Sequence, residues 1–126
     1  MSARNLLTVN GIFALLDALL LIFFPSFLAG FFGVEGDGAA LQIIQLLGAA
    51  LVGYGFSSWW MRNAGPSEAR TAFLRAGAVG YLVVSLVSVY MAVTGQGKAI
   101  FWAAFGISFL LGILFLYVGM RSMEDS

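Results

Sequence analysis

Four long apolar stretches occupy almost the whole chain, and they constrain its fold more than any other feature. They run over residues 6–24, 39–61, 71–93 and 99–120. Each is about 19–23 residues long, the length that an α-helix rising 1.5 Å per residue needs to cross a hydrocarbon core of ~30 Å. The sequence therefore predicts an all-α protein with four transmembrane helices. We expect the outer faces of these helices to contact the lipid bilayer.

Composition excludes several classes of protein. The chain is 61% hydrophobic and 10% charged, whereas a soluble domain carries about 25% charged residues. It contains no Cys and no His, which excludes thiolate and imidazole metal sites, disulfides, and catalysis by either residue. A net charge of zero gives no general attraction to nucleic acid. We predict one membrane domain over residues 1–126, with no metal, no cofactor and no nucleic-acid partner.

The basic residues predict an orientation. In a four-span topology one side receives five arginines and the other receives Lys98; the arginines are Arg4, Arg62, Arg70, Arg75 and Arg121. Because Lys and Arg accumulate in cytoplasmic loops, we expect both termini in the cytoplasm. Short loops between the spans favour an up-down-up-down bundle. We also expect the first span to remain uncleaved and to act as the insertion signal.

Several residues mark the ends of the spans. Pro25 lacks an amide donor and disfavours helix in the residue before it, so it should end the first span. The stretch 26–32 either lies along the membrane surface or extends a tilted helix. Trp59 and Trp60 are typical of the membrane–water interface. We expect Ser67 to cap the third span.

Small residues at helical spacing predict the packing surfaces. Between membrane helices, close approach of backbones is a main source of attraction, so small residues gather at contacts. The predicted packing residues are Ala49 and Gly53 in the second span, Ala76 and Gly80 in the third, and Ala104, Ser108 and Gly112 in the fourth.

Asp17 is the most informative polar residue. It lies near the middle of the first span, where a charged Asp costs roughly 2.5–3.5 kcal/mol on insertion scales. It must therefore be protonated, or meet water or a partner, and we expect it to face the bundle interior. The candidate partners from other spans are Tyr54, Tyr81, Ser85, Ser108 and Arg75. Arg75 can instead extend to the headgroups.

Asn10 lies seven residues before Asp17, on the same side of the helix. The pair admits two interpretations. One is interhelical hydrogen bonding that fixes the register of the bundle, and the other is a half-channel for protons or cations.

The glycine and proline pattern also resembles a known family outline. The segments LLLIFFP (19–25), FG (32–33) and GAALVGYG (48–55) resemble small four-span bacterial membrane proteins of unknown function, DoxX-like in layout. The resemblance implies a multi-pass protein of the bacterial inner membrane and carries no catalytic residue. Small multidrug transporters also have four spans and an acid in the first, but the acid here is Asp17 and no further motif matches.

These observations favour a non-enzymatic integral membrane protein. We expect it to act as an interaction or accessory subunit, in a homo-oligomer or a larger membrane complex. The alternative is a small proton-coupled transporter or channel that uses Asp17.

Overall fold

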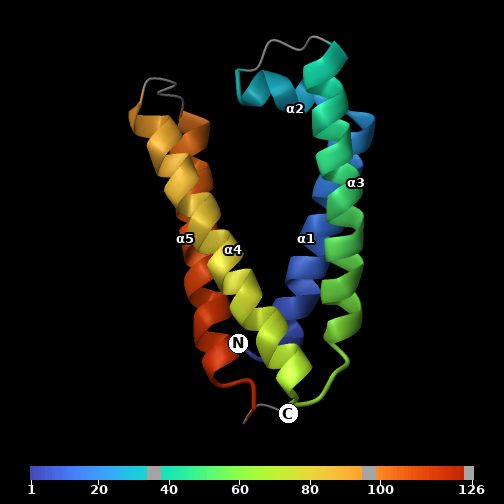
Figure 1. The fold of residues 1–126 in the computed structure, drawn as a ribbon, viewed down its shortest axis with the longest axis vertical. Coiled ribbons are helices and arrows are strands. Elements are labelled where there is room, and N and C mark those ends of the chain that lie inside the picture. The colour runs from blue at the N-terminus through green and yellow to red at the C-terminus, as the bar shows by residue number, and fades with distance from the viewer. Residues whose placement is uncertain (34–37, 95–98, 124–126) are drawn as a thin grey trace. The chain divides into compact units, whose positions relative to one another are not determined.

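The computed structural model describes residues 1–33, 38–94 and 99–123, and all regular structure in these ranges is helical. The helices are α1 (Ala3–Phe23), α2 (Pro25–Phe31), α3 (Gly38–Met61), α4 (Glu68–Val93) and α5 (Ala99–Met120) (Figure 1). All except α2 are long and apolar enough to cross a membrane. The prediction of an all-α chain with four spans is confirmed.

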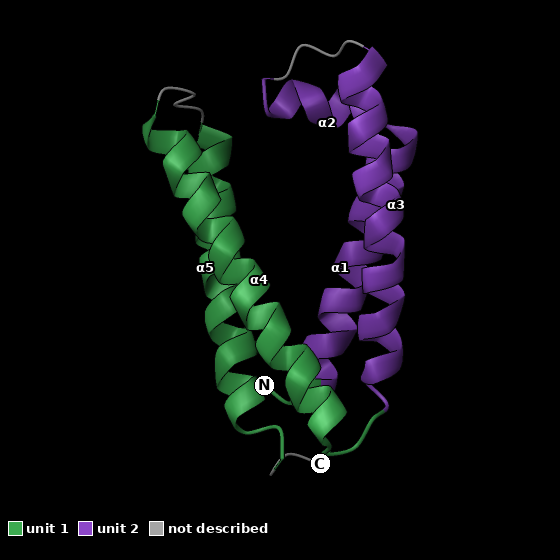
Figure 2. Ribbon diagram, in the orientation of Figure 1, with its two compact units in different colours: residues 1–3, 64–126 green, residues 4–63 purple. Residues whose placement is uncertain are grey.

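The chain divides into two compact units, and each is described by itself (Figure 2). Unit 2 is Arg4–Asn63 and pairs α1 with α3 as an antiparallel hairpin that also carries α2. Unit 1 is Met1–Ala3 with Ala64–Ser126 and pairs α4 with α5 in the same manner. In each span a third or less of the residues is buried within the chain, which leaves broad apolar faces for lipid or other helices.

The first span ends where Pro25 predicts. Phe24, with φ −132° and ψ 51°, leaves the helical conformation, and α2 begins at Pro25. Because α1 ends at Phe23, carbonyls in its last turn lack helical partners. Gln45 of α3 donates its Nε2 to one such end-of-helix carbonyl, that of Ile22, at 3.0 Å.

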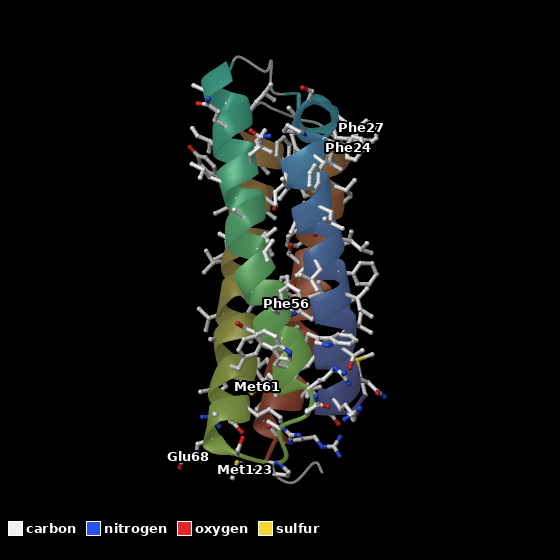
Figure 3. The ribbon with its side chains drawn as sticks, turned by 90° about the vertical axis from the view of Figure 1, so that its right-hand side faces the viewer. Phe24, Phe27, Phe56, Met61, Glu68 and Met123 are labelled. Atoms are coloured by element: carbon white, nitrogen blue, oxygen red, sulfur yellow. The ribbon has the colours of Figure 1, made fainter. Side chains whose placement is uncertain are left out.

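The stretch 26–32 forms a short separate helix and does not extend α1. α2 crosses the ends of α1 and α3 (Figures 1 and 3). Its Ala29 is buried, while Phe27 and Phe31 are 60% and 53% exposed and meet edge-to-face at 5.0 Å. Gly33 follows with φ 70°, a left-handed conformation that glycine adopts without steric cost. This arrangement fits a helix that lies along the membrane surface.

The start of α4 is capped as the sequence predicts. The Ser67 Oγ accepts from the backbone N–H of Arg70 at 3.2 Å, and Glu68 lies in the first helical turn. The cap satisfies one of the free amides at the helix start. It extends α4 three residues further toward the N-terminus than the apolar stretch alone.

Candidate functional site

A buried polar cluster joins α1 to α3 in unit 2. The Asn10 side chain is 3% exposed, and its Nδ2 donates to Tyr54 Oη at 2.9 Å and to Ser58 Oγ at 3.0 Å. Ser58, which is fully buried, donates in turn to the Leu7 carbonyl oxygen at 2.9 Å. Asn10 and Tyr54 are therefore partners of each other, and Ser58 is a member of the cluster that sequence reasoning missed.

Glycines bring the two backbones close enough for this cluster to form. A Cβ added to Gly11 would lie 3.1 Å from both the Gly55 carbonyl oxygen and the Trp59 amide nitrogen. At Gly48 a Cβ would lie 3.1 Å from the Ala18 carbonyl oxygen. These are backbone atoms that cannot rotate away. The Ser58–Leu7 bond, from a side chain on one helix to a carbonyl on the other, depends on this close approach.

Asp17 does not join the cluster. Its side chain is exposed, and within unit 2 no described residue forms a hydrogen bond or ion pair with it; Tyr54 accepts from Asn10 and forms no bond to Asp17. α1 runs from Ala3 to Phe23, so Asp17 lies ~6 Å from the helix centre at 1.5 Å per residue. That depth is well inside a hydrocarbon core of ~30 Å. Whether Asp17 faces a bundle interior stays a prediction.

The candidate polar residues of unit 1 lie at different kinds of position. Ser85 and Ser108 are buried, and Ser85 donates to the Leu82 carbonyl of its own helix at 2.7 Å. The Tyr81 ring packs on the Phe115 ring at 5.3 Å. Arg75 is exposed and lines a shallow hollow with Glu68 and Met123, two residues at the end of the hairpin (Figure 3). This position fits an arginine that extends toward the headgroups.

Arg70 is the main polar residue that sequence reasoning did not identify as structural. It is 1% exposed, and its Nε donates to Ser122 Oγ at 2.9 Å. Its Nη2 donates to the Ser122 carbonyl, and its Nη1 donates to the Ala64 carbonyl at 3.1 Å. One guanidinium thus joins the segment before α4 to the turn after α5. No sequence signal separates it from the other arginines near the span ends.

Within the hairpins, the predicted packing residues of α5 lie at the helix contact, whereas those of α3 and α4 lie away from it. Ser108 and Gly112 are buried, Ala104 is half-buried, and a Cβ on Gly112 would lie 2.8 Å from Leu82 Cδ2. By contrast, a Cβ on Gly53 or Gly80 would meet no atom within 4 Å, so neither makes the expected close contact. Ala49 and Ala76 are exposed. The contacting glycines are instead Gly11, Gly48, Gly55, Gly77, Gly112 and Gly119.

Within the described ranges, no group of three or more Asp, Glu, His or Cys side chains is arranged to hold a metal ion. Lys98, which entered the prediction of orientation, lies outside those ranges.

Comparison with known proteins places the chain in a family. A family model described as a domain of unknown function, DUF8292, matches residues 8–123. The match includes Asn10, Asp17, Tyr54 and Ser58. No curated protein and no solved structure matches the chain. Since the family model covers most of its length, the chain belongs to the DUF8292 family.

Proposed function

We propose that this protein is a non-enzymatic membrane protein that associates laterally with another membrane protein, and that Asp17 is the centre of the contact. The observation that carries the proposal is the exposure of Asp17 within its span, without a hydrogen-bond partner in unit 2. A charged carboxyl at such depth costs roughly 2.5–3.5 kcal/mol. A neighbouring helix with a hydrogen-bond donor at the same depth would offset much of this cost.

The Asn10 cluster supports association over transport. A half-channel from Asn10 to Asp17 requires Asn10 to face water. Its amide instead donates to Tyr54 and Ser58 in a buried site. Such a cluster fixes the register of α1 against α3 and leaves Asp17 as the polar group that points out of the hairpin.

A proton-coupled transporter that uses Asp17 is the alternative, supported by the depth of this residue in α1. It predicts that Asp17→Asn abolishes pH-driven flux in liposomes while the fold is kept. The DoxX-like layout supports a role in the bacterial inner membrane, with both termini cytoplasmic as the arginines indicate.

The test is purification of the full chain in mild detergent, with co-eluting proteins identified and quantified by mass spectrometry. The variants are Asp17→Leu, Asp17→Asn, and Leu19→Asn as a control that adds an amide to another exposed position of α1. We expect Asp17→Leu to lose a stoichiometric partner. Asp17→Asn should retain it because an amide still forms hydrogen bonds, and Leu19→Asn should retain it because Asp17 is intact. Equal recovery of the same proteins with Asp17→Leu would contradict the proposal.

A further inference from the structure

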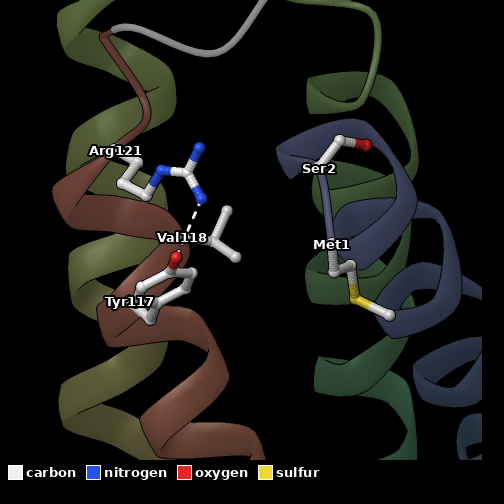
Figure 4. Close-up of a pocket in the computed structure, with 5 residues that line it drawn as sticks. All are labelled: Met1, Ser2, Tyr117, Val118 and Arg121. Atoms are coloured by element: carbon white, nitrogen blue, oxygen red, sulfur yellow. Dashed lines mark hydrogen bonds between the residues drawn. The ribbon is translucent and has the colours of Figure 1, made fainter.

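A polar hollow lies beside the end of α5 in unit 1. It is lined by Met1, Ser2, Tyr117, Val118 and Arg121 and has a volume of about 230 Å³ (Figure 4). Arg121 directly follows the last helical residue, Met120. The hollow therefore lies where a transmembrane helix leaves the hydrocarbon core, which is the depth of lipid headgroups.

Two hydrogen-bond donors in this hollow are held together. Arg121 Nη1 donates to Tyr117 Oη at 2.9 Å (Figure 4), and the guanidinium lies 5.3 Å from the centre of the tyrosine ring. A guanidinium has five N–H donors, of which this bond uses one, and a tyrosine hydroxyl that accepts still has its own hydrogen to donate. The pair thus presents a positive charge and several donors side by side.

The charge balance of this hollow differs from that around the other exposed arginine of the hairpin. Arg75 shares its hollow with the carboxylate of Glu68. No acidic residue lines the hollow at Arg121 within the described ranges. An anion is therefore favoured beside Arg121 and opposed beside Arg75.

We propose that Arg121 and Tyr117 bind the phosphate headgroup of an anionic phospholipid. Guanidinium groups recognise phosphate through paired, charge-assisted hydrogen bonds. The volume is below the ~300–1,000 Å³ of enclosed ligand pockets, which suits a single headgroup. Met1, which is 64% exposed, provides an apolar side chain beside these polar groups, as the start of an acyl chain requires. The site is separate from Asp17 and does not depend on the proposed function.

The experiment uses the delipidated full chain in detergent, titrated with short-chain phosphatidylglycerol or phosphatidylcholine. Bound lipid is counted by native mass spectrometry, and thermal stability is followed in parallel. We expect phosphatidylglycerol to bind and to raise the melting temperature. Arg121→Gln should weaken binding about tenfold or more, and Tyr117→Phe about threefold, since bonds to charged groups are the stronger ones. Tyr117→Phe keeps the charge and thus separates the site from general attraction.

Arg75→Gln is the matched control, because it removes the same charge from the same unit outside the hollow. It should leave binding unchanged. Equal losses in Arg75→Gln and Arg121→Gln, or equal binding of phosphatidylcholine, would overturn the proposal. Inorganic phosphate that binds as tightly as the lipid would also overturn it, since the site would then belong to a free anion.

Glu124 and Asp125 lie outside the described residues. The double variant Glu124→Gln with Asp125→Asn should leave lipid binding unchanged or raise it. A loss of lipid binding in this variant would also overturn the assignment.

Discussion

The two hairpins of this protein are held together by different devices. In unit 2 the backbones of α1 and α3 touch at Gly11 and Gly55, and a buried cluster centred on Asn10 bonds across the contact. In unit 1 the nearest atoms to the glycines belong to large side chains, with Phe115 over Gly77 and Leu82 against Gly112. Leu15 packs on Gly55 of unit 2 in the same way, so Gly11 is the contact that distinguishes the two units. Water does not drive membrane helices together, so each pair needs its own source of specific attraction.

The two kinds of contact should respond differently when a side chain is added at the glycine. A contact between backbones has no rotatable atom, so an added side chain must separate the helices. A contact between a side chain and a glycine can relax in part when the side chain shifts. Unit 1 compensates with a buried guanidinium at one end of the hairpin, where Arg70 bonds Ser122 and Ala64. Four variants test this comparison.

Gly11→Leu should have the largest effect. Its Cβ would lie 3.1 Å from backbone atoms of Gly55 and Trp59, so α1 and α3 would have to move apart. We expect a loss of about 3 kcal/mol or failure to fold, the upper part of the range for overpacking. Reversible unfolding in mixed detergent micelles measures it. Gly53→Leu is the control, and equal destabilisation there would show that size alone, and not the contact, is responsible.

Arg70→Gln should follow, because it shortens the side chain that bonds Ser122 and Ala64. Bonds from a charged donor contribute about 1.5–3 kcal/mol, so we expect a loss of about 2–3 kcal/mol. The same unfolding assay applies. Ser122→Ala removes one of these bonds and should cost about half as much. An Arg70→Gln variant as stable as the parent chain would show that the guanidinium does not hold the hairpin.

Gly77→Leu tests whether the ring contact yields. A Cβ there would lie 2.6 Å from Phe115 Cδ1, so the buried ring must shift, but the nearest atoms belong to a side chain and not to the backbone of α5. We therefore expect about 1–2 kcal/mol, less than at Gly11. A neighbouring change, Gly80→Leu, should cost nearly nothing because no atom lies within 4 Å of that Cβ. A larger loss at Gly77 than at Gly11 would reverse the comparison.

Asn10→Ala should have the smallest effect. It removes the bonds to Tyr54 and Ser58, and hydrogen bonds between membrane helices average ~0.6 kcal/mol each. The expected loss is about 1 kcal/mol, and Tyr54→Phe should lose about half of that. A loss of several kcal/mol would mean that the polar cluster, rather than the glycine contact, dominates the stability of unit 2.

Spans and caps could be predicted from the sequence because they depend on neighbouring residues. Apolar length gave the four helices, Pro25 the end of α1, and Ser67 the start of α4. The contacting faces could not be predicted in the same way. Several small residues compete on each helix, and a step from Gly53 to Gly55 rotates the contact by about 200°. Which face of a helix packs against the neighbouring helix depends on the side chains of both helices.

In the candidate site, too, local features could be predicted from the sequence and contacts between helices could not. Asp17 is recognisable because an acid inside a span is costly wherever it points. Its separation from Asn10 was not predictable, since seven residues return the helix to nearly the same side. Asn10 reaches Tyr54 and Ser58, whereas Asp17 is exposed. The role of Arg70 depends on Ser122, 52 residues later, and no local pattern connects the two.

Site-specific photocrosslinking from the face of Asp17 is the most direct test of lateral association. A crosslinking residue at Phe13, one turn from Asp17 and 62% exposed, reports on that face, and one at Ile12, 44% exposed, reports on another side of α1. We predict a crosslinked adduct of higher mass at Phe13 that disappears with Asp17→Leu, and none of the same kind at Ile12. Crosslinks from Phe13 only to this chain's own helices, unchanged by Asp17→Leu, would contradict the account.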